Sequence, residues 1–311
     1  MTDPATPAAT PGSTMLPAYA ALVFGACGMG MSPLFVRFAA EAGVGPYASA
    51  FWRVFLALPF LWIWARVEEG GSPGRPTFRK PMIWAGLLFS GDLFFWHLSI
   101  LGTSIANATF LSTTAPVWVL LVSVVVLKEQ VRPATLGGLA LCLLGGSSLI
   151  GDTLSLAPER LLGDLFGLLT AVFFGLYFFG IKYARDLSGA GRSTFAASAV
   201  ASLVLLLVAL ATRDPLIPTT LKGAASLLLM AMVSQAFGQG LLSVALGRLP
   251  TVFSALVIFL EAVAAAALGW IVLDEALSPL QWLGGGLILC GIFIARPRTA
   301  DTQQENDHDR H

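Results

Sequence analysis

The sequence predicts an all-α integral membrane protein with ten transmembrane helices in two inverted five-helix repeats. Three observations support this fold class: an apolar composition, ten long apolar runs, and an internal resemblance between two distant segments. Of the 311 residues, 56% are hydrophobic and only 12% are charged. Soluble proteins carry about 25% charged residues, so this chain cannot cover its surface for water. We therefore expect a lipid bilayer to surround it.

The apolar runs are long enough to cross a membrane. A hydrocarbon core about 30 Å thick requires about 20 residues of helix. Backbone groups in lipid must satisfy their own hydrogen bonds, so each run is predicted to be helical. Loop residues separate the runs, for example the glycine- and proline-containing stretch 70–74. The predicted spans are 17–38, 46–66, 80–101, 104–127, 133–150, 161–183, 193–212, 222–246, 250–273 and 279–296.

The basic residues predict the orientation. With the N-terminus placed in the cytoplasm, 13 of the 18 Lys and Arg residues fall on the cytoplasmic side and four fall outside, while Arg53 lies within the second span. This excess follows the positive-inside rule. We therefore expect both termini in the cytoplasm and the protein in the inner (plasma) membrane. The formal net charge is zero, which argues against nucleic acid as a partner.

Two segments of the chain match at an offset of 146 residues. Segment 126–145 (VLKEQVRPATLGGLALCLLG) aligns with segment 272–291 (VLDEALSPLQWLGGGLILCG), with coincident Glu, Pro and spaced Gly residues. Each half then contains five helices, an odd number, so the second half must be inserted upside down. Inverted repeats are typical of transporters, because one chain can adopt two mirror-related access states. The predicted organisation is a tail (1–16), a first repeat (17–150), a linker (151–160), a second repeat (161–296) and a tail (297–311).

Residues 245–295 carry a specific pattern: Arg-Leu-Pro before the ninth span, Glu261 within it, Asp-Glu after it, and Pro279 five residues before Gly284. This pattern resembles the second repeat of EamA-type transporters in the drug/metabolite transporter superfamily. The first half shows a weaker copy, and Arg53 is similar to the family's intramembrane arginine. The ten-helix YddG-type amino-acid exporters are the branch that the chain resembles most.

The resemblance covers roughly residues 17–296 and implies a cavity lined by the first, third, fourth, sixth, eighth and ninth helices. The chain departs from the family at Ala262, where a proline often follows the glutamate. The ninth helix therefore has no proline to break it at this point. Ten helices can complete such a cavity in one chain, so a monomer is sufficient.

Three charged side chains within the spans are candidates for structural or coupling roles. Arg53 and Asp92 lie at similar depths, which favours a structural ion pair between them; binding of a substrate carboxylate by Arg53 is the alternative. Glu261 lies near the middle of the ninth span. It is either a paired structural acid or a site for a proton or a substrate amine. Ionisable groups at this depth are costly and usually functional.

The eighth span carries a polar stripe. Gln235, Gln239 and Ser243 recur every four residues, so they share one face of a regular helix. The 146-residue offset places His97 at the position equivalent to Ser243. We predict that these side chains face a central cavity; hydrogen bonds between helices are the alternative for the stripe, and a structural role is the alternative for His97. Trp96 either stacks on a substrate or anchors the membrane interface.

The other candidates come from three further helices. The complete predicted substrate-binding set is Gln235, Gln239, Ser243, His97, Trp96, Tyr177, Asn107 and Met31. A cavity of this kind, largely apolar with a few amides, hydroxyls and aromatic rings, suits a small neutral or zwitterionic metabolite. We expect no cofactor and no metal, since the three cysteines lie in apolar runs without a CxxC pair. Sequence patterns of hydrolases, metalloproteases and nucleotide-binding enzymes do not occur, which argues against an enzyme.

The sequence thus predicts a secondary transporter that exports small metabolites, most favourably amino acids, by alternating access. A proton-coupled drug exporter is one alternative. The small multidrug members of the superfamily rely on an acid in the first helix, and here that helix has none. An uncoupled facilitator of small neutral metabolites is another alternative, which the sequence does not separate from a coupled carrier.

Overall fold

The computed structural model describes residues 15–70, 78–103, 105–150, 158–273 and 276–297, and all regular elements in these ranges are helical. The predicted Asp-Glu turn at 274–275, most of the predicted linker and most of both tails lie outside the described residues. The helices are α1 (Leu16–Gly30), α2 (Ser32–Glu41), α3 (Pro46–Phe55), α4 (Leu58–Glu68), α5 (Lys80–Gly102), α6 (Ile105–Thr113), α7 (Ala115–Val125), α8 (Pro133–Ile150), η2 (Pro158–Arg160), α9 (Leu161–Arg185), α10 (Ala190–Ala211), α11 (Leu221–Leu229), η3 (Met230–Gln239), α12 (Gly240–Leu246), α13 (Thr251–Val257), α14 (Leu260–Leu273) and α15 (Pro279–Ala295).

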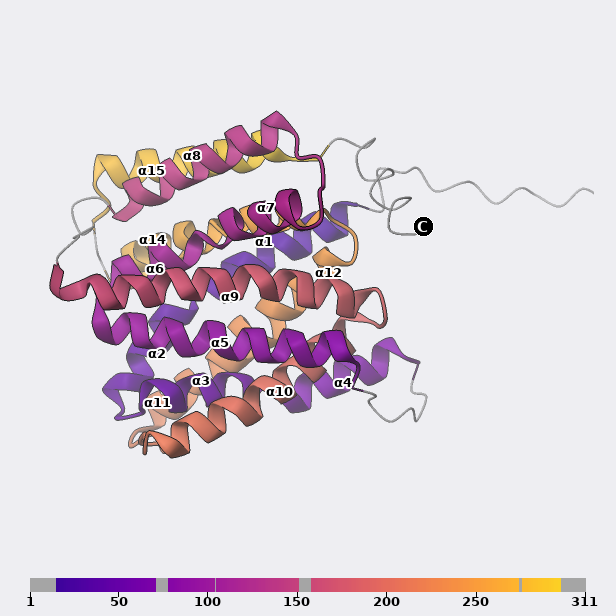
Figure 1. The fold of residues 1–311 in the computed structure, drawn as a ribbon. Coiled ribbons are helices and arrows are strands. Elements are labelled where there is room, and N and C mark those ends of the chain that lie inside the picture. Colours follow the sequence, from indigo (N-terminus) through magenta and orange to yellow (C-terminus); the bar gives the residue numbers. More distant parts are fainter. Residues whose placement is uncertain (1–14, 71–77, 104, 151–157, 274–275, 298–311) are drawn as a thin grey trace, which may run out of the picture.

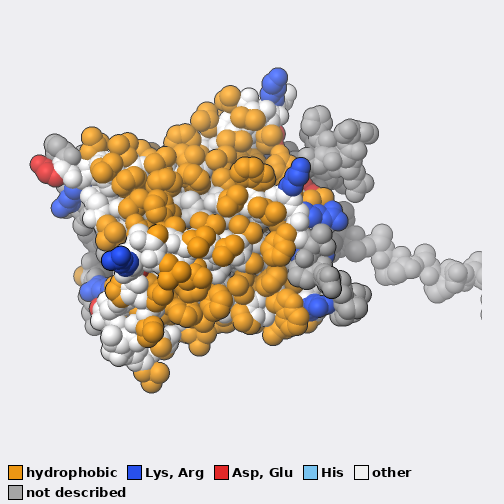
Figure 2. Space-filling view, turned by 60° about the horizontal axis from the view of Figure 1, so that its bottom comes forward, with side chains coloured by type: hydrophobic (Ala, Val, Ile, Leu, Met, Phe, Trp, Pro, Cys, Tyr) orange, Lys and Arg blue, Asp and Glu red, His pale blue; other side chains and the backbone are white. Residues whose placement is uncertain are grey.

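In the part of the chain that the structure describes, consecutive helices join end to end into membrane-crossing rods, which we number in chain order. They are α1 with α2, α3 with α4, α5, α6 with α7, α8, α9, α10, α11 with η3 and α12, α13 with α14, and α15. Within the described ranges, nine apolar helices of 18–26 residues are long enough to cross a membrane. The last helix, α15, has 17 residues, which is still within the range of about 17–25 that spans a bilayer. Figure 2 shows a broad apolar belt between two ends of the molecule, where charged side chains gather. The protein is therefore a multi-pass membrane protein, as the sequence predicted.

The two repeats are inverted, and the contact between α8 and α15 shows it. These helices occupy equivalent places in the two repeats and lie side by side at one edge of the bundle (Figure 1). A Cβ atom built on Gly138 would lie 2.5 Å from the carbonyl oxygen of Gly291, and one on Gly284 would lie 2.6 Å from that of Gly145. The 146-residue offset exchanges these two contacts with each other. Such self-complementary pairing is the signature of a two-fold relation, so the predicted inverted arrangement is confirmed.

We call the end of the bundle at which α1 begins and α15 ends the terminal face. The start of α1 and the end of α15 both lie on the right side of Figure 1. The distal face is the opposite end, where α2 and α5 end. The first two rods and the fourth are each interrupted near a proline, namely Pro33, Pro59 and Pro116. Proline removes a backbone donor and clashes with the preceding turn, so it breaks a helix.

The ninth rod is broken without a proline. Between α13 and α14, the amide of Ile258 donates to Ala255 and the amide of Phe259 donates to Leu256, so the hydrogen bonds tighten to a three-residue spacing. A short 3₁₀ stretch inside a helix often marks a hinge. The break places Glu261 in the first turn of α14, where a negative charge interacts favourably with the helix dipole. The composition of this helix gave no sign of the break.

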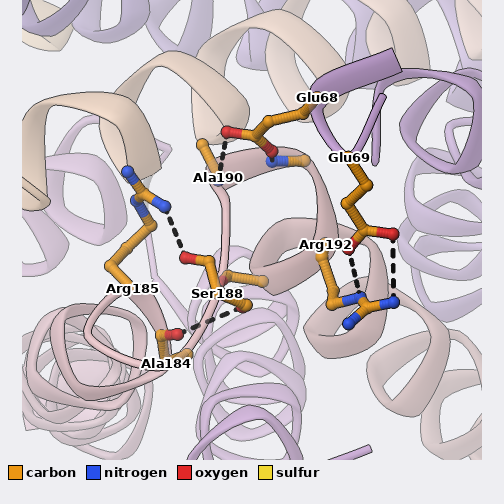
Figure 3. Close-up of polar contacts among 9 residues, drawn as sticks. Glu68, Glu69, Ala184, Arg185, Ser188, Ala190 and Arg192 are labelled. Carbon is orange, nitrogen blue, oxygen red and sulfur yellow. Dashed lines mark hydrogen bonds and ion pairs between the residues drawn. The ribbon is translucent and has the colours of Figure 1, made fainter. Parts of the chain in front are cut away.

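The second and seventh rods are tied together at both faces by equivalent contacts. At the terminal face, the Glu68 carboxylate accepts hydrogen bonds from the amides of Ala190 and Gly191, both 2.8 Å, at the start of α10 (Figure 3). At the distal face, the Asp214 carboxylate accepts from the amides of Tyr47 and Ala48, at 2.7 and 3.1 Å, at the start of α3. We call these two contacts the reciprocal caps. Each satisfies amides that a helix start leaves without partners.

Candidate functional site

A central cavity lies between helices from both repeats. The breaks in the rods that begin with α1, α6 and α13 bring short polar segments beside it. Among the described residues, its lining consists of Met29, Gly30, Ser32, Pro33, Arg53, Asp92, Leu93, Trp96, Thr109, Ser112, Thr113, Thr170, Phe174, Gln239, Ile258, Glu261 and Ala265. The lining is therefore apolar over much of its area, with hydroxyl groups, one amide and three charged groups.

Arg53 is the electrostatic centre of the cavity. It is only 8% exposed and interacts electrostatically with both Asp92 and Glu261. Its Nε atom donates to the side-chain oxygen of Gln235 at 3.3 Å, and its Nη1 atom donates to the Ser32 hydroxyl at 3.1 Å. Coulomb attraction is strong where water is scarce, so these partners stabilise a buried cation. Arg53, Asp92 and Glu261 thus line one cavity, and the ion pair expected between Arg53 and Asp92 stays a prediction.

The two glutamines of the eighth rod do different things. Segment η3 is π-helical over Met230–Gln239, so the eighth rod is irregular where the predicted stripe begins. Gln235 faces Arg53 and donates to the Ser198 hydroxyl at 3.0 Å, so both ends of its amide are engaged. Gln239 instead lines the cavity, and its Oε1 atom has no hydrogen-bond partner.

Several buried polar atoms beside the cavity lack a partner within the described structure. They are Oε1 of Gln239, Oε1 of Glu261 and the hydroxyl of Thr170. Gln239 is 1% exposed and Thr170 also 1%, so bulk water does not reach them freely. Buried polar groups are normally hydrogen-bonded. An arrangement of this kind is suited to a ligand or ordered water that completes the bonding.

Six predicted substrate-binding residues lie away from the cavity lining in this structure, and Gln235, described above, is one of them. The His97 ring stands 2.6 Å from the carbonyl oxygen of Leu93 through Nδ1, which must therefore donate, and its Nε2 has no partner. Asn107 donates to Asp164 at 3.2 Å. Tyr177 stacks on Phe89, and Ser243 offers its backbone carbonyl to Arg185. Met31 forms the turn between α1 and α2.

Trp96 and Gln239 of the predicted substrate-binding set line the cavity, and so do Arg53, Asp92 and Glu261, which were predicted as structural or coupling charges. The sequence did not indicate Thr170 and Phe174 of α9 as cavity residues. It also did not indicate the three hydroxyl-bearing residues Thr109, Ser112 and Thr113. The Ser-Thr-Thr run before Pro116 was a usable signal, because hydroxyl side chains often satisfy the backbone beside a proline break. Within the described part of the chain, no three His, Cys, Asp or Glu residues come together to hold a metal ion.

Most residues of the cavity lining lie in the distal halves of their rods, whereas Gln239 and Ile258 lie nearer the terminal face. Ser32 and Arg53 lie in the distal parts of their rods, and Trp96 lies six residues before the distal end of α5. The terminal half is filled instead by packed apolar side chains. There Tyr19 of α1 meets Phe253 of α13 edge-on, with ring centroids 5.8 Å apart, inside the main apolar cluster.

Comparison with known proteins agrees with this architecture. The chain is 28% identical over 292 residues to a protein of Archaeoglobus fulgidus that is named an uncharacterized transporter, covering 89% of this chain and 95% of that protein. A solved structure, titled "Crystal structure of protein", superposes with a TM-score of 0.76 at 17% identity, covering 92% of this chain and 98% of the other. That likeness concerns the fold alone.

The pattern of the EamA-like transporter family matches the chain twice, over residues 16–150 and again over residues 161–296. The two matches cover both halves of the inverted bundle, each with five rods. They agree with a transporter and not an enzyme, and they imply a small molecule as the substrate. The chain therefore belongs to the EamA-like transporter family.

Proposed function

We propose that the protein exports small metabolites, amino acids first among them, by alternating access around the central cavity. The observation that carries this proposal is the lining itself, which combines charged and amide groups with apolar side chains such as Leu93, Phe174 and Ile258. A zwitterion with an apolar side chain matches such a surface. Substrate sites of inverted-repeat transporters lie near the bilayer midplane, between the repeats.

The excess of basic residues on the terminal side supports a cytoplasmic terminal face. In that orientation the cavity, most of whose lining lies toward the distal face, belongs to an outward-facing state. The terminal side is held by a contact with no counterpart in the first repeat: Arg185 donates to the Ser243 carbonyl at 2.9 Å and to the Ser188 carbonyl at 2.6 Å. The residue equivalent to Arg185 is Ala39, which cannot make these bonds.

This asymmetry is what alternating access requires. In the opposite state the two repeats exchange conformations, so contacts made by one repeat alone are the ones that change. The bonds of Arg185 are expected to break when the terminal face opens. Arg185→Ala should therefore raise hydrogen–deuterium exchange in α12 and in the turn that contains Ser188. Unchanged exchange at both places would remove Arg185 from the closure.

The test of function is uptake into liposomes that contain the purified protein. Labelled amino acids, nucleobases and a cationic dye are supplied separately, with and without a pH gradient. Saturable amino-acid uptake that unlabelled amino acids compete for supports the proposal, and independence from the gradient indicates a facilitator. Dye movement alone, dependent on the gradient, would replace the amino-acid proposal with a proton-coupled drug exporter.

A further inference from the structure

The cavity contains acceptor atoms that lack a hydrogen-bond donor within the described part of the protein. Two of the cavity-lining atoms that lack partners are acceptors: the side-chain oxygen of Gln239 and one carboxyl oxygen of Glu261. Arg53, the main donor of the site, uses two of its five N–H groups on Gln235 and Ser32 and interacts electrostatically with Asp92 and Glu261. The acceptor oxygens of Gln239 and Glu261 therefore call for N–H or O–H donors on a ligand.

The charge inventory points the same way. Among the described residues that line the cavity, Arg53 is the basic side chain, while Asp92 and Glu261 are both acidic. When both acids are ionised, one negative charge remains without a cation. An uncompensated charge removed from water is costly. A ligand that brings a positive charge restores the balance, whereas a ligand that brings only a carboxylate makes the imbalance worse.

We propose that the cavity recognises the protonated amine of its substrate, with the side-chain oxygens of Glu261 and Gln239 as the hydrogen-bond acceptors. An ammonium group carries three N–H donors and no acceptor, which matches two acceptors from different helices. Glu261 stands at the start of α14, beside the break in the ninth rod, and Gln239 ends the π-helical segment. The ligand thus joins the eighth and ninth rods at the two places where their helices are irregular.

The neighbouring backbone holds the acceptor in place. The chain of α1 passes against Glu261 at Gly30, where an added Cβ would lie 2.6 Å from the Glu261 carbonyl oxygen. This close approach restricts the position of the Glu261 backbone. An acceptor whose position is fixed before binding loses less freedom on binding, which favours selective recognition of one chemical group.

This inference rests on the proposed function, and it adds which end of the substrate the cavity binds. Its first test uses three compounds that share the leucine skeleton: L-leucine, 3-methylbutylamine and 4-methylpentanoate. The first has both an amine and a carboxylate, the second only the amine, and the third only the carboxylate. Binding to the purified full-length protein is measured by equilibrium dialysis, with the ligand-induced rise in thermal midpoint as a second readout.

Leucine and 3-methylbutylamine are expected to bind, and 4-methylpentanoate is expected to bind at least tenfold more weakly. Stronger binding of 4-methylpentanoate than of the amine would overturn the inference, while a transporter of small metabolites would stand. If none of the three binds and liposomes take up no amino acid, the proposed function itself fails. The two failures are therefore distinguishable.

Variants test the acceptors directly. Glu261→Gln keeps the size of the side chain and removes its charge, and Gln239→Leu removes the amide oxygen. Each should weaken 3-methylbutylamine binding about tenfold or more, since hydrogen bonds to charged groups are among the strong ones. The matched control is Glu159→Gln, an exposed position in η2, which should leave binding unchanged. Folded variants at both positions 239 and 261 with wild-type affinity would refute the assignment.

Discussion

The contact between α8 and α15 allows a sharp test with one methyl group. In Gly138→Ala, the new Cβ would lie 2.5 Å from the carbonyl oxygen of Gly291, whereas ordinary contacts begin at 3.4 Å, so the helices must part by about 0.9 Å. Overpacking of this kind costs about 1–3 kcal/mol. The adjacent Gly137 has open space around it, so Gly137→Ala adds the same methyl group without a clash.

The comparison of the two variants isolates the steric cost. Alanine is favoured over glycine within a helix by about 1 kcal/mol, and this gain is common to both substitutions. Gly138→Ala should therefore be less stable than Gly137→Ala by about 1–3 kcal/mol. Thermal unfolding of the purified protein in one detergent, followed by circular dichroism, gives the order of midpoints: Gly137→Ala at or above wild type, and Gly138→Ala below it.

Symmetry supplies a second pair. Gly284 is the equivalent of Gly138, and a Cβ added to it would lie 2.6 Å from the carbonyl oxygen of Gly145, while a Cβ added to Gly285 would have no atom within 4 Å. Gly284→Ala should lower the midpoint to a similar extent, and Gly285→Ala should not. Equal midpoints for Gly138→Ala and Gly137→Ala would contradict the close approach of the two helices and the two-fold reasoning built on it.

Two further predictions concern polar contacts. Glu68→Ala and Asp214→Ala each remove one reciprocal cap and should each cost about 1 kcal/mol of stability. Because the caps lie at opposite faces, the losses should add in the double variant. A strongly non-additive shift of its thermal midpoint would contradict their independence. Gln235→Leu removes a partner of the buried Arg53, whereas the amide oxygen of Gln239 has no partner to lose among the described residues. Gln235→Leu should therefore lower the thermal midpoint more than Gln239→Leu. A lower midpoint for Gln239→Leu would assign Gln239 to packing.

The reciprocal caps have a consequence for the transport cycle. Each repeat makes one of them, since Glu68 and Asp214 are 146 residues apart and each accepts from two of the first amides of the opposing helix. Under the proposed alternating access, exchange of the two repeat conformations would keep both contacts. The second and seventh rods should therefore move as one unit, while asymmetric contacts such as those of Arg185 open and close.

The sequence alone determined the architecture of this protein. Composition and apolar length predicted the membrane-crossing rods, because lipid admits few backbone structures. The match between segments 126–145 and 272–291 and the odd number of helices per repeat predicted the inversion. The depth of Arg53 and Asp92 along their helices favoured an ion pair between them, and both line the same cavity. All these inferences depend on length, periodicity and connectivity, which are local properties of the chain.

Only the tertiary structure decided the site. Helical periodicity assigned Gln235, Gln239 and Ser243 to one face, but Gln235 is engaged by Arg53 and Ser198 while Gln239 lines the cavity. The ninth rod breaks at residues 258–259 without a proline, and this break sets where Glu261 stands. Such irregular turns are stabilised by packing against other helices and not by their own residues. The direction of each side chain therefore depends on contacts between segments far apart in the chain. The periodicity of a single helix does not predict those contacts.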